Sequence, residues 1–150
     1  MGKFESLLRR EGHPGEVQHQ ASRELPGYLV HSRLNHWRPN SGIPSQGTRF
    51  LIGVACWSIY DMRLLDALDC VLVKGPRLVQ VDIFDVDECA SQEDVEHYFP
   101  GIGKIDQTPV VGVWRDGKQV YSGSGYAGRA VVANYFEIDH ARLVRLPGDA

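Results

Sequence analysis

The sequence has few cysteines, no long apolar run and no excess of positive charge. Its only cysteines are Cys56, Cys70 and Cys89, which form no CxxC pair, and its six histidines show no zinc-binding spacing. No apolar segment approaches the roughly 20 residues that a membrane-spanning helix needs. The formal net charge is -3, whereas surfaces that bind nucleic acid are usually basic. We therefore expect no bound metal, no membrane span and no nucleic-acid partner.

The N-terminus also lacks the long apolar stretch of a secretion signal, because Met1 to Arg10 mixes charged and apolar residues. We therefore expect a cytoplasmic protein whose thiols stay reduced. A composition of 43% hydrophobic and 23% charged residues is typical of a globular protein, and 150 residues suit one domain.

Strands and helices are expected to alternate over the last two thirds of the chain. Residues 1–47 show only weak helical periodicity and end in a cluster of proline, glycine and serine, so we interpret them as an N-terminal extension and loop. Apolar runs, helical spacing and turn residues then predict successive elements. The expected order is a strand at 50–55, a helix over 59–68, a strand at 78–84, a helix that follows Ser91 and reaches 99, a hairpin at 109–121 and a helix at 130–136.

This order resembles the thioredoxin fold over about residues 48–136, and the hairpin strengthens the resemblance. Thr108-Pro109 precedes an apolar run and the Asp116-Gly117 turn, as the cis-proline of the family precedes its strand and turn. The resemblance implies an α/β domain with a mixed β-sheet flanked by helices and a cis bond before Pro109. Residues 137–150 then form a C-terminal tail.

A second local resemblance lies at the junction of the first strand and helix. Thioredoxins carry A-x-W-C-G-P-C there, and in this chain Trp57 matches the tryptophan while Ser58 and Asp61 occupy the two cysteine positions. Disulfide exchange needs a thiolate at a helix N-terminus and a second thiol to resolve the mixed disulfide. Ser58 and Asp61 instead predict a capping box, in which the two side chains bond exposed amides at the helix start.

We therefore expect a redox-inactive, thioredoxin-like domain that binds a protein or peptide, as an adaptor or assembly chaperone. In the family an extended peptide pairs with the backbone beside the cis-proline. The candidate contact residues are Trp57, Ser58, Tyr60, Asp61, Thr108 and Pro109. A third interpretation is a subunit held by its N-terminal extension, and the oligomeric state stays open.

The alternative is an enzyme in which Cys56 acts as the catalytic thiol of a monothiol oxidoreductase or a peroxide-reducing enzyme. A shift of one residue would place Cys56 at the nucleophilic position, although the charge of Asp61 near the helix start would oppose thiolate formation. Cys70 and Cys89 are expected to be packing residues.

Gly123 to Gly128 match the GxGxxG pattern of dinucleotide-binding loops. Here, however, the preceding strand is the second arm of a hairpin, and no second strand–helix unit follows. We therefore expect no cofactor and assign these glycines to the turn between sheet and helix.

Two further patterns are weaker. Residues 85–96 are rich in acidic side chains, but Cys89 and Ala90 stand where a calcium loop needs a ligand and a glycine. Ser58, Asp61 and His97 contain the residue types of a hydrolase triad, but no nucleophile elbow surrounds the serine. We expect neither a calcium site nor a hydrolase.

Overall fold

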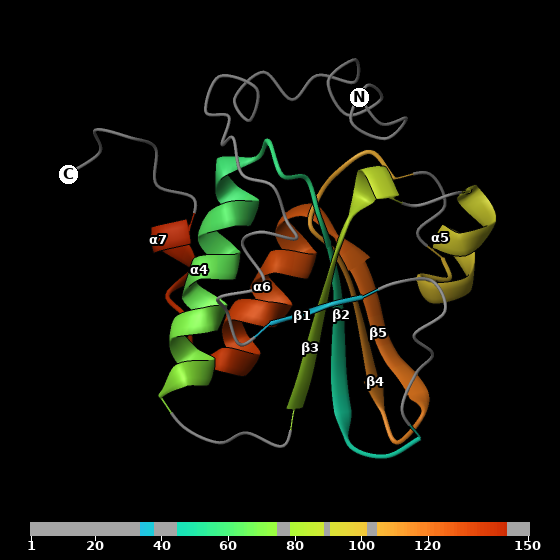
Figure 1. Cartoon of the computed structure of the whole chain (residues 1–150), viewed down its shortest axis with the longest axis horizontal. Helices are drawn as coiled ribbons and strands as arrows, with labels where there is room; N and C mark the ends of the chain where they lie inside the picture. The colour runs from blue at the N-terminus through green and yellow to red at the C-terminus, as the bar shows by residue number, and fades with distance from the viewer. Residues whose placement is uncertain (1–33, 38–44, 75–78, 89–90, 102–104, 144–150) are drawn as a thin grey trace.

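The described residues of the chain form a five-stranded sheet with helices on both faces (Figure 1). A computed structural model describes residues 34–37, 45–74, 79–88, 91–101 and 105–143. The elements are β1 (Asn35–His36), β2 (Thr48–Val54), α4 (Ile59–Val73), β3 (Val79–Asp85), the 3-10 helix η1 (Val86–Glu88), α5 (Gln92–Tyr98), β4 (Val110–Arg115), β5 (Lys118–Ser124), α6 (Gly125–Phe136) and α7 (His140–Leu143).

The sheet is mixed, and its strands lie in the order β1-β3-β2-β4-β5. β1 and β2 both run parallel to β3, while β4 runs antiparallel to β2 and to β5. Helix α4 makes the crossover between the parallel strands β2 and β3, and β4 and β5 form the predicted hairpin, which turns at Asp116 and Gly117. The predicted mixed sheet of the thioredoxin-like fold, flanked by helices, is confirmed.

The sheet and its core extend beyond the predicted limits of 48 and 136. Strand β1 lies within the segment interpreted as an N-terminal extension, and its neighbours Leu34 and Trp37 are buried in the core. Helix α7 lies within the predicted tail and buries Leu143. The helical periodicity expected near the N-terminus falls outside the described residues.

Two apolar layers sandwich the sheet, because successive side chains of each strand point to opposite faces. Helices α4, α6 and α7 cover one face and α5 covers the other (Figure 1). On β2, Phe50, Ile52 and Val54 join the core with α4 and α6, whereas Leu51 joins the core with α5. The core on the α5 face comprises Trp37, Leu51, Ala55, Trp57, Phe84, Val86, Val95, Phe99, Ile105, Val110 and Trp114.

Glycines in the central strands make room for the aromatic rings of the α5-face core. A Cβ atom on Gly53 would lie 2.5 Å from the ring of Phe84, and one on Gly112 would lie 2.6 Å from the ring of Trp114. These contacts are too short for any larger side chain, so the two glycines allow the rings to pack against the backbone.

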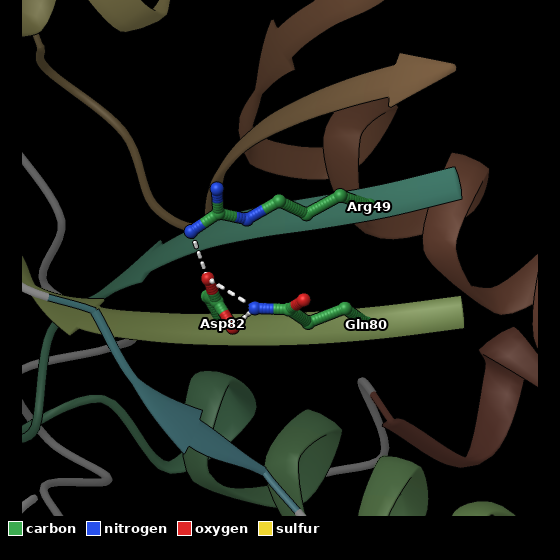
Figure 2. Close-up of polar contacts among 3 residues, drawn as sticks. All are labelled: Arg49, Gln80 and Asp82. Carbon is green, nitrogen blue, oxygen red and sulfur yellow. Dashed lines mark hydrogen bonds and ion pairs between the residues drawn. The ribbon is translucent and has the colours of Figure 1, made fainter. Parts of the chain in front are cut away.

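A buried ion pair joins the two central parallel strands. Figure 2 shows Arg49 of β2 and Asp82 of β3 pointing toward one another, and they form a salt bridge. Gln80 donates from Nε2 to Asp82 Oδ1 at 3.0 Å and to Oδ2 at 3.2 Å. Both charged side chains are buried, and the amide places a further donor on the carboxylate.

Among the helices that the structure describes, none is long and apolar enough to cross a bilayer.

Candidate functional site

The helices α4 and α6 both begin at one end of the sheet, together with the start of β4; we call this the α4/α6 end. Strand β2 ends there and leads into α4, and its Gly53 pairs with Val110 of β4. The carbonyl oxygen of Pro109 accepts a hydrogen bond of 3.0 Å from the amide of Gly125, the first residue of α6. The fold thus brings the predicted positions 56–61 and 108–109 to the same place.

The two positions that align with the cysteines of thioredoxins lie at the start of α4, where a hydrogen-bonded turn of residues 55–58 leads into the helix. Ser58 is the N-cap, and its Oγ accepts from the amide of Asp61 at 3.4 Å. The Asp61 carboxylate accepts from the amide of Ala55 at 2.9 Å, and the Ser58 amide donates to the carbonyl of Ala55. In the predicted capping box, the Asp61 carboxylate would accept from the amide of Ser58. It accepts from the amide of Ala55 instead, because the Ser58 amide already donates to the Ala55 carbonyl.

Most of the predicted contact residues are buried. Ser58 and Asp61 are 0% exposed, Trp57 is 7% exposed within the α5-face core, and Thr108 and Pro109 are also buried. The peptide bond between Thr108 and Pro109 is cis. The indole of Trp57 packs into the α5-face core, and a partner-binding role for Trp57 and Thr108 stays a prediction.

Cys56, the candidate nucleophile, lies in the turn two residues before the N-cap of α4 and is half-buried. It packs against the core that α4 and α6 share. This position is outside the helix N-terminus, where amide dipoles stabilise a thiolate. The packing role expected for Cys70 is wrong, since that residue is exposed on α4. Cys89 lies outside the described residues.

A group of polar and aromatic side chains lies at the α4/α6 end, and only Tyr60 among them was predicted from the sequence. Arg129 of α6 is only 6% exposed, and its Cζ lies 5.7 Å from the ring centroid of Tyr60 in the first turn of α4. Tyr126, 67% exposed, meets the ring of His140 edge-on at 4.6 Å between centroids. A signal for Arg129 exists in the sequence, because it shares helical spacing with the buried Val132 and Phe136.

The pKa of His140 is lowered in the folded chain. Burial lowers the pKa of His140, and the positive charge of Arg129 lowers it further, while Asp139 acts in the opposite direction. Its Nε2 atom is buried and has no hydrogen-bond partner in the part of the chain that the structure describes. The fold therefore favours neutral imidazole.

The glycines of the GxGxxG match form no phosphate-binding loop. Gly123 belongs to β5, while Gly125 and Gly128 belong to α6, so strand and helix are directly continuous. Gly125 has a φ of +63°, and a Cβ on Gly128 would lie 3.2 Å from Cγ2 of Val111. The glycines thus allow the sharp junction and the close packing of α6 on β4.

The other two patterns also have structural roles. His97 lies on α5, across the sheet from Ser58 and Asp61, so the hydrolase triad is not assembled (Figure 1). Ser91 caps α5 by accepting from the amide of Asp94 at 3.2 Å. Within residues 34–37, 45–74, 79–88, 91–101 and 105–143, no group of three or more His, Cys, Asp or Glu side chains is placed to hold a metal ion.

No protein-family model and no curated protein matches the sequence. Among solved structures, a yeast mitochondrial 1-Cys peroxiredoxin has a TM-score of 0.45 at 16% identity, over 61% of this chain and 78% of that chain. Human ERp44 in form I has a TM-score of 0.47 at 14% identity, over 77% of this chain and 30% of ERp44. A zinc-bound form of human ERp44 has a TM-score of 0.41 at 15% identity, over 62% of this chain and 25% of ERp44. The chain thus matches less than a third of ERp44, and these likenesses say nothing of activity or partners.

Proposed function

We propose that this chain is a thioredoxin-like protein-binding domain, an adaptor or assembly chaperone, that performs no dithiol exchange. The observation that supports this most directly is the state of Ser58 and Asp61. Both stand where thioredoxins carry cysteine, both are fully buried, and both make hydrogen bonds to backbone amides at the start of α4. Residues in these positions cap a helix and leave no thiol at its N-terminus.

The surface that we propose for the partner is a tyrosine rim, which consists of Tyr60, Gln107 and Tyr126. Tyr126, in the first turn of α6, is the most exposed of the large apolar side chains described, and Tyr60, in the first turn of α4, is half-exposed. Gln107 is exposed and touches the position that a Cβ on Gly125 would occupy. Tyrosine is enriched at binding surfaces because it combines a large apolar ring with a hydrogen-bonding hydroxyl. In this proposal the buried residues Trp57, Thr108 and Pro109 hold the backbone next to the tyrosine rim in place.

The test begins with a displayed library of random twelve-residue peptides selected against the immobilised full chain. Affinity of a selected peptide is then measured by calorimetry. We expect Tyr60→Ala and Tyr126→Ala each to weaken binding by more than about 1 kcal/mol, roughly fivefold, as anchor residues do. Val120→Ala on β5 is the matched control, because Val120 is also strongly exposed (54%) but lies outside the rim.

Two results would contradict the proposal. If selected peptides bind both tyrosine variants as tightly as the original chain, the rim is not the contact surface. If no peptide is enriched over an unrelated immobilised protein, peptide binding itself is wrong.

A further inference from the structure

Arg129 is a buried cation without a bonded anion. It is 6% exposed, its Nε has no hydrogen-bond partner, and no carboxylate among the described residues forms an ion pair with it. Its Cζ atom lies over the ring of Tyr60, 5.7 Å from the ring centroid. A ring face attracts the charge by about 0.5–2 kcal/mol, whereas removing a cation from water costs several kcal/mol. The buried Nε–H of Arg129 is therefore a hydrogen-bond donor without an acceptor among the described residues.

The start of α6 also has donors without protein acceptors. Ser124 is the N-cap of this 12-residue helix but makes no side-chain capping bond, and the Gly125 amide is bonded to Pro109. The amides of Tyr126 and Ala127 are the next two that an α-helix leaves unbonded in its first turn. They lie at the positive end of the helix dipole.

Both features belong to the first two turns of α6. Arg129 is one turn inside α6, and long helical side chains lean toward the N-terminus of their helix. Its contact with Tyr60 places the guanidinium at the first turn of α4 as well. The first turn of α4 already contains the Asp61 carboxylate, whereas the first turn of α6 contains no acidic residue, so an anion at the start of α6 would be favoured by the helix dipole and by Arg129.

We propose that the α4/α6 end binds one carboxylate group of an extended peptide, with Arg129 and the first amides of α6 as its hydrogen-bond donors. The carboxylate comes from an acidic side chain or from the C-terminus of the peptide. This inference rests on the proposed peptide-binding function and assigns the chemistry of the bound segment.

The charge balance favours a carboxylate over a phosphate group. Arg129 supplies one positive charge, and the lowered pKa of His140 keeps that neighbour neutral near pH 7. The adjacent positions on the same helix face, Val132 and Ala133, are buried and apolar. One carboxylate neutralises one guanidinium and matches its planar pair of donors. A phosphate dianion would leave a negative charge in an apolar surrounding.

The first experiment titrates the isotope-labelled full chain with sodium acetate and, separately, with inorganic phosphate. Nuclear magnetic resonance follows the Arg129 Nε–H signal and the amide signals of Tyr126 and Ala127. We expect acetate to shift all three signals along one saturating curve. Arg129→Gln should abolish the two amide shifts, and the matched control Arg115→Gln, on the exposed end of β4, should leave them unchanged. Arg129→Lys should keep the shifts but need a higher acetate concentration.

The second experiment uses a selected peptide in which each acidic residue is replaced by its amide in turn, and in which the C-terminus is free or amidated. We expect one of these changes to weaken binding to the original chain at least tenfold and to leave binding to Arg129→Gln unchanged. The change that does so identifies the source of the carboxylate. Melting curves of each variant verify folding, and if Arg129→Gln does not fold, Arg129→Met replaces it.

The results separate this inference from the function on which it rests. If peptides bind equally well with every carboxylate amidated, the carboxylate site is wrong and peptide binding stands. If acetate saturates the site but no peptide binds, the carboxylate donors stand and the peptide function is wrong. Absence of any acetate shift, or saturation by phosphate at a lower concentration than acetate, overturns the inference.

Discussion

At the scale of single residues, the interior of this domain holds two arginines in opposite situations. Arg49 forms a salt bridge with Asp82, whose carboxylate also accepts from Gln80. Arg129 is similarly buried but faces an aromatic ring and has no carboxylate partner among the described residues. The two sites should therefore respond to neutral substitutions with opposite signs.

Replacement of Arg129 should stabilise the free protein. Methionine keeps an unbranched stem that can pack against Tyr60 and removes the desolvated charge. We expect Arg129→Met to raise the free energy of unfolding by about 1 kcal/mol or more, as measured by urea denaturation without added anions. A loss of stability would mean that the charge is already compensated in the folded chain.

Removal of the partner charge should have the reverse effect. Asp82→Asn removes the carboxylate of the buried salt bridge with Arg49, and breaking a buried pair by removing one charge typically costs about 3–5 kcal/mol. We expect a decrease in that range in the same urea experiment. Asp106→Asn, an exposed acidic residue, should change stability by less than about 0.5 kcal/mol. Equal effects at both positions would show that Asp82 is effectively solvated.

The sequence predicted only part of the α4/α6 end at this scale. The serine and aspartate at positions 58 and 61 carried a local signal, because N-cap preferences act over three residues. The bond from Ala55 to Asp61 depends on the turn conformation between them, and the burial of Trp57 depends on contacts with strands far away in sequence. Neither can be derived from spacing alone.

At the scale of elements, a histidine of α7 contacts an aromatic residue of α6. His140 touches the ring of Tyr126 and senses the charge of Arg129, and its pKa is lowered in the folded chain. As the pH falls, the unfolded chain therefore binds this proton before the folded chain does. The contribution of neutral His140 to stability is fully present above the unfolded pKa of about 6.5 and is lost as the pH falls toward the lower folded value.

The pH dependence due to His140 is measured by comparing the original chain with the variant His140→Gln. The carboxylates titrate in both proteins, so their contribution cancels in the difference. We expect the stability of the original chain relative to the variant to decrease between pH 7.5 and the lower pKa, with urea denaturation as the measurement. Parallel stability curves for the two proteins across that range would show that His140 is not the source of the dependence.

Long, periodic elements were predicted from the sequence, and short ones were not. The strands and helices from 48 to 99 follow their apolar patterns closely. Strand β1 has only two residues and α7 only four, so neither displays a period. Helix α6 begins at Gly125, earlier than expected, because its glycines disfavour a helix locally but allow close packing on β4. That packing is a tertiary effect.

At the scale of the whole molecule, the two described thiols lie apart on the chain and neither is at the N-terminus of a helix. Cys56 is half-buried before α4, and Cys70 is exposed in the second half of the same helix. We expect no turnover of a disulfide substrate above the uncatalysed rate, with dithiothreitol or with glutathione as reductant. If turnover occurs and is lost in Cys56→Ser but kept in Cys70→Ser, the monothiol alternative is established and the binding-only function is refuted.

The placement of the aromatic residues has a practical consequence for all these unfolding measurements. The chain has three tryptophans, Trp37, Trp57 and Trp114, and all of them belong to the α5-face core. Intrinsic indole fluorescence therefore monitors one side of the sheet, while α4 and α6 on the other side are the longest of the described helices and contribute strongly to the circular dichroism. Agreement between the two optical signals is then a built-in test of whether both layers melt in a single cooperative step.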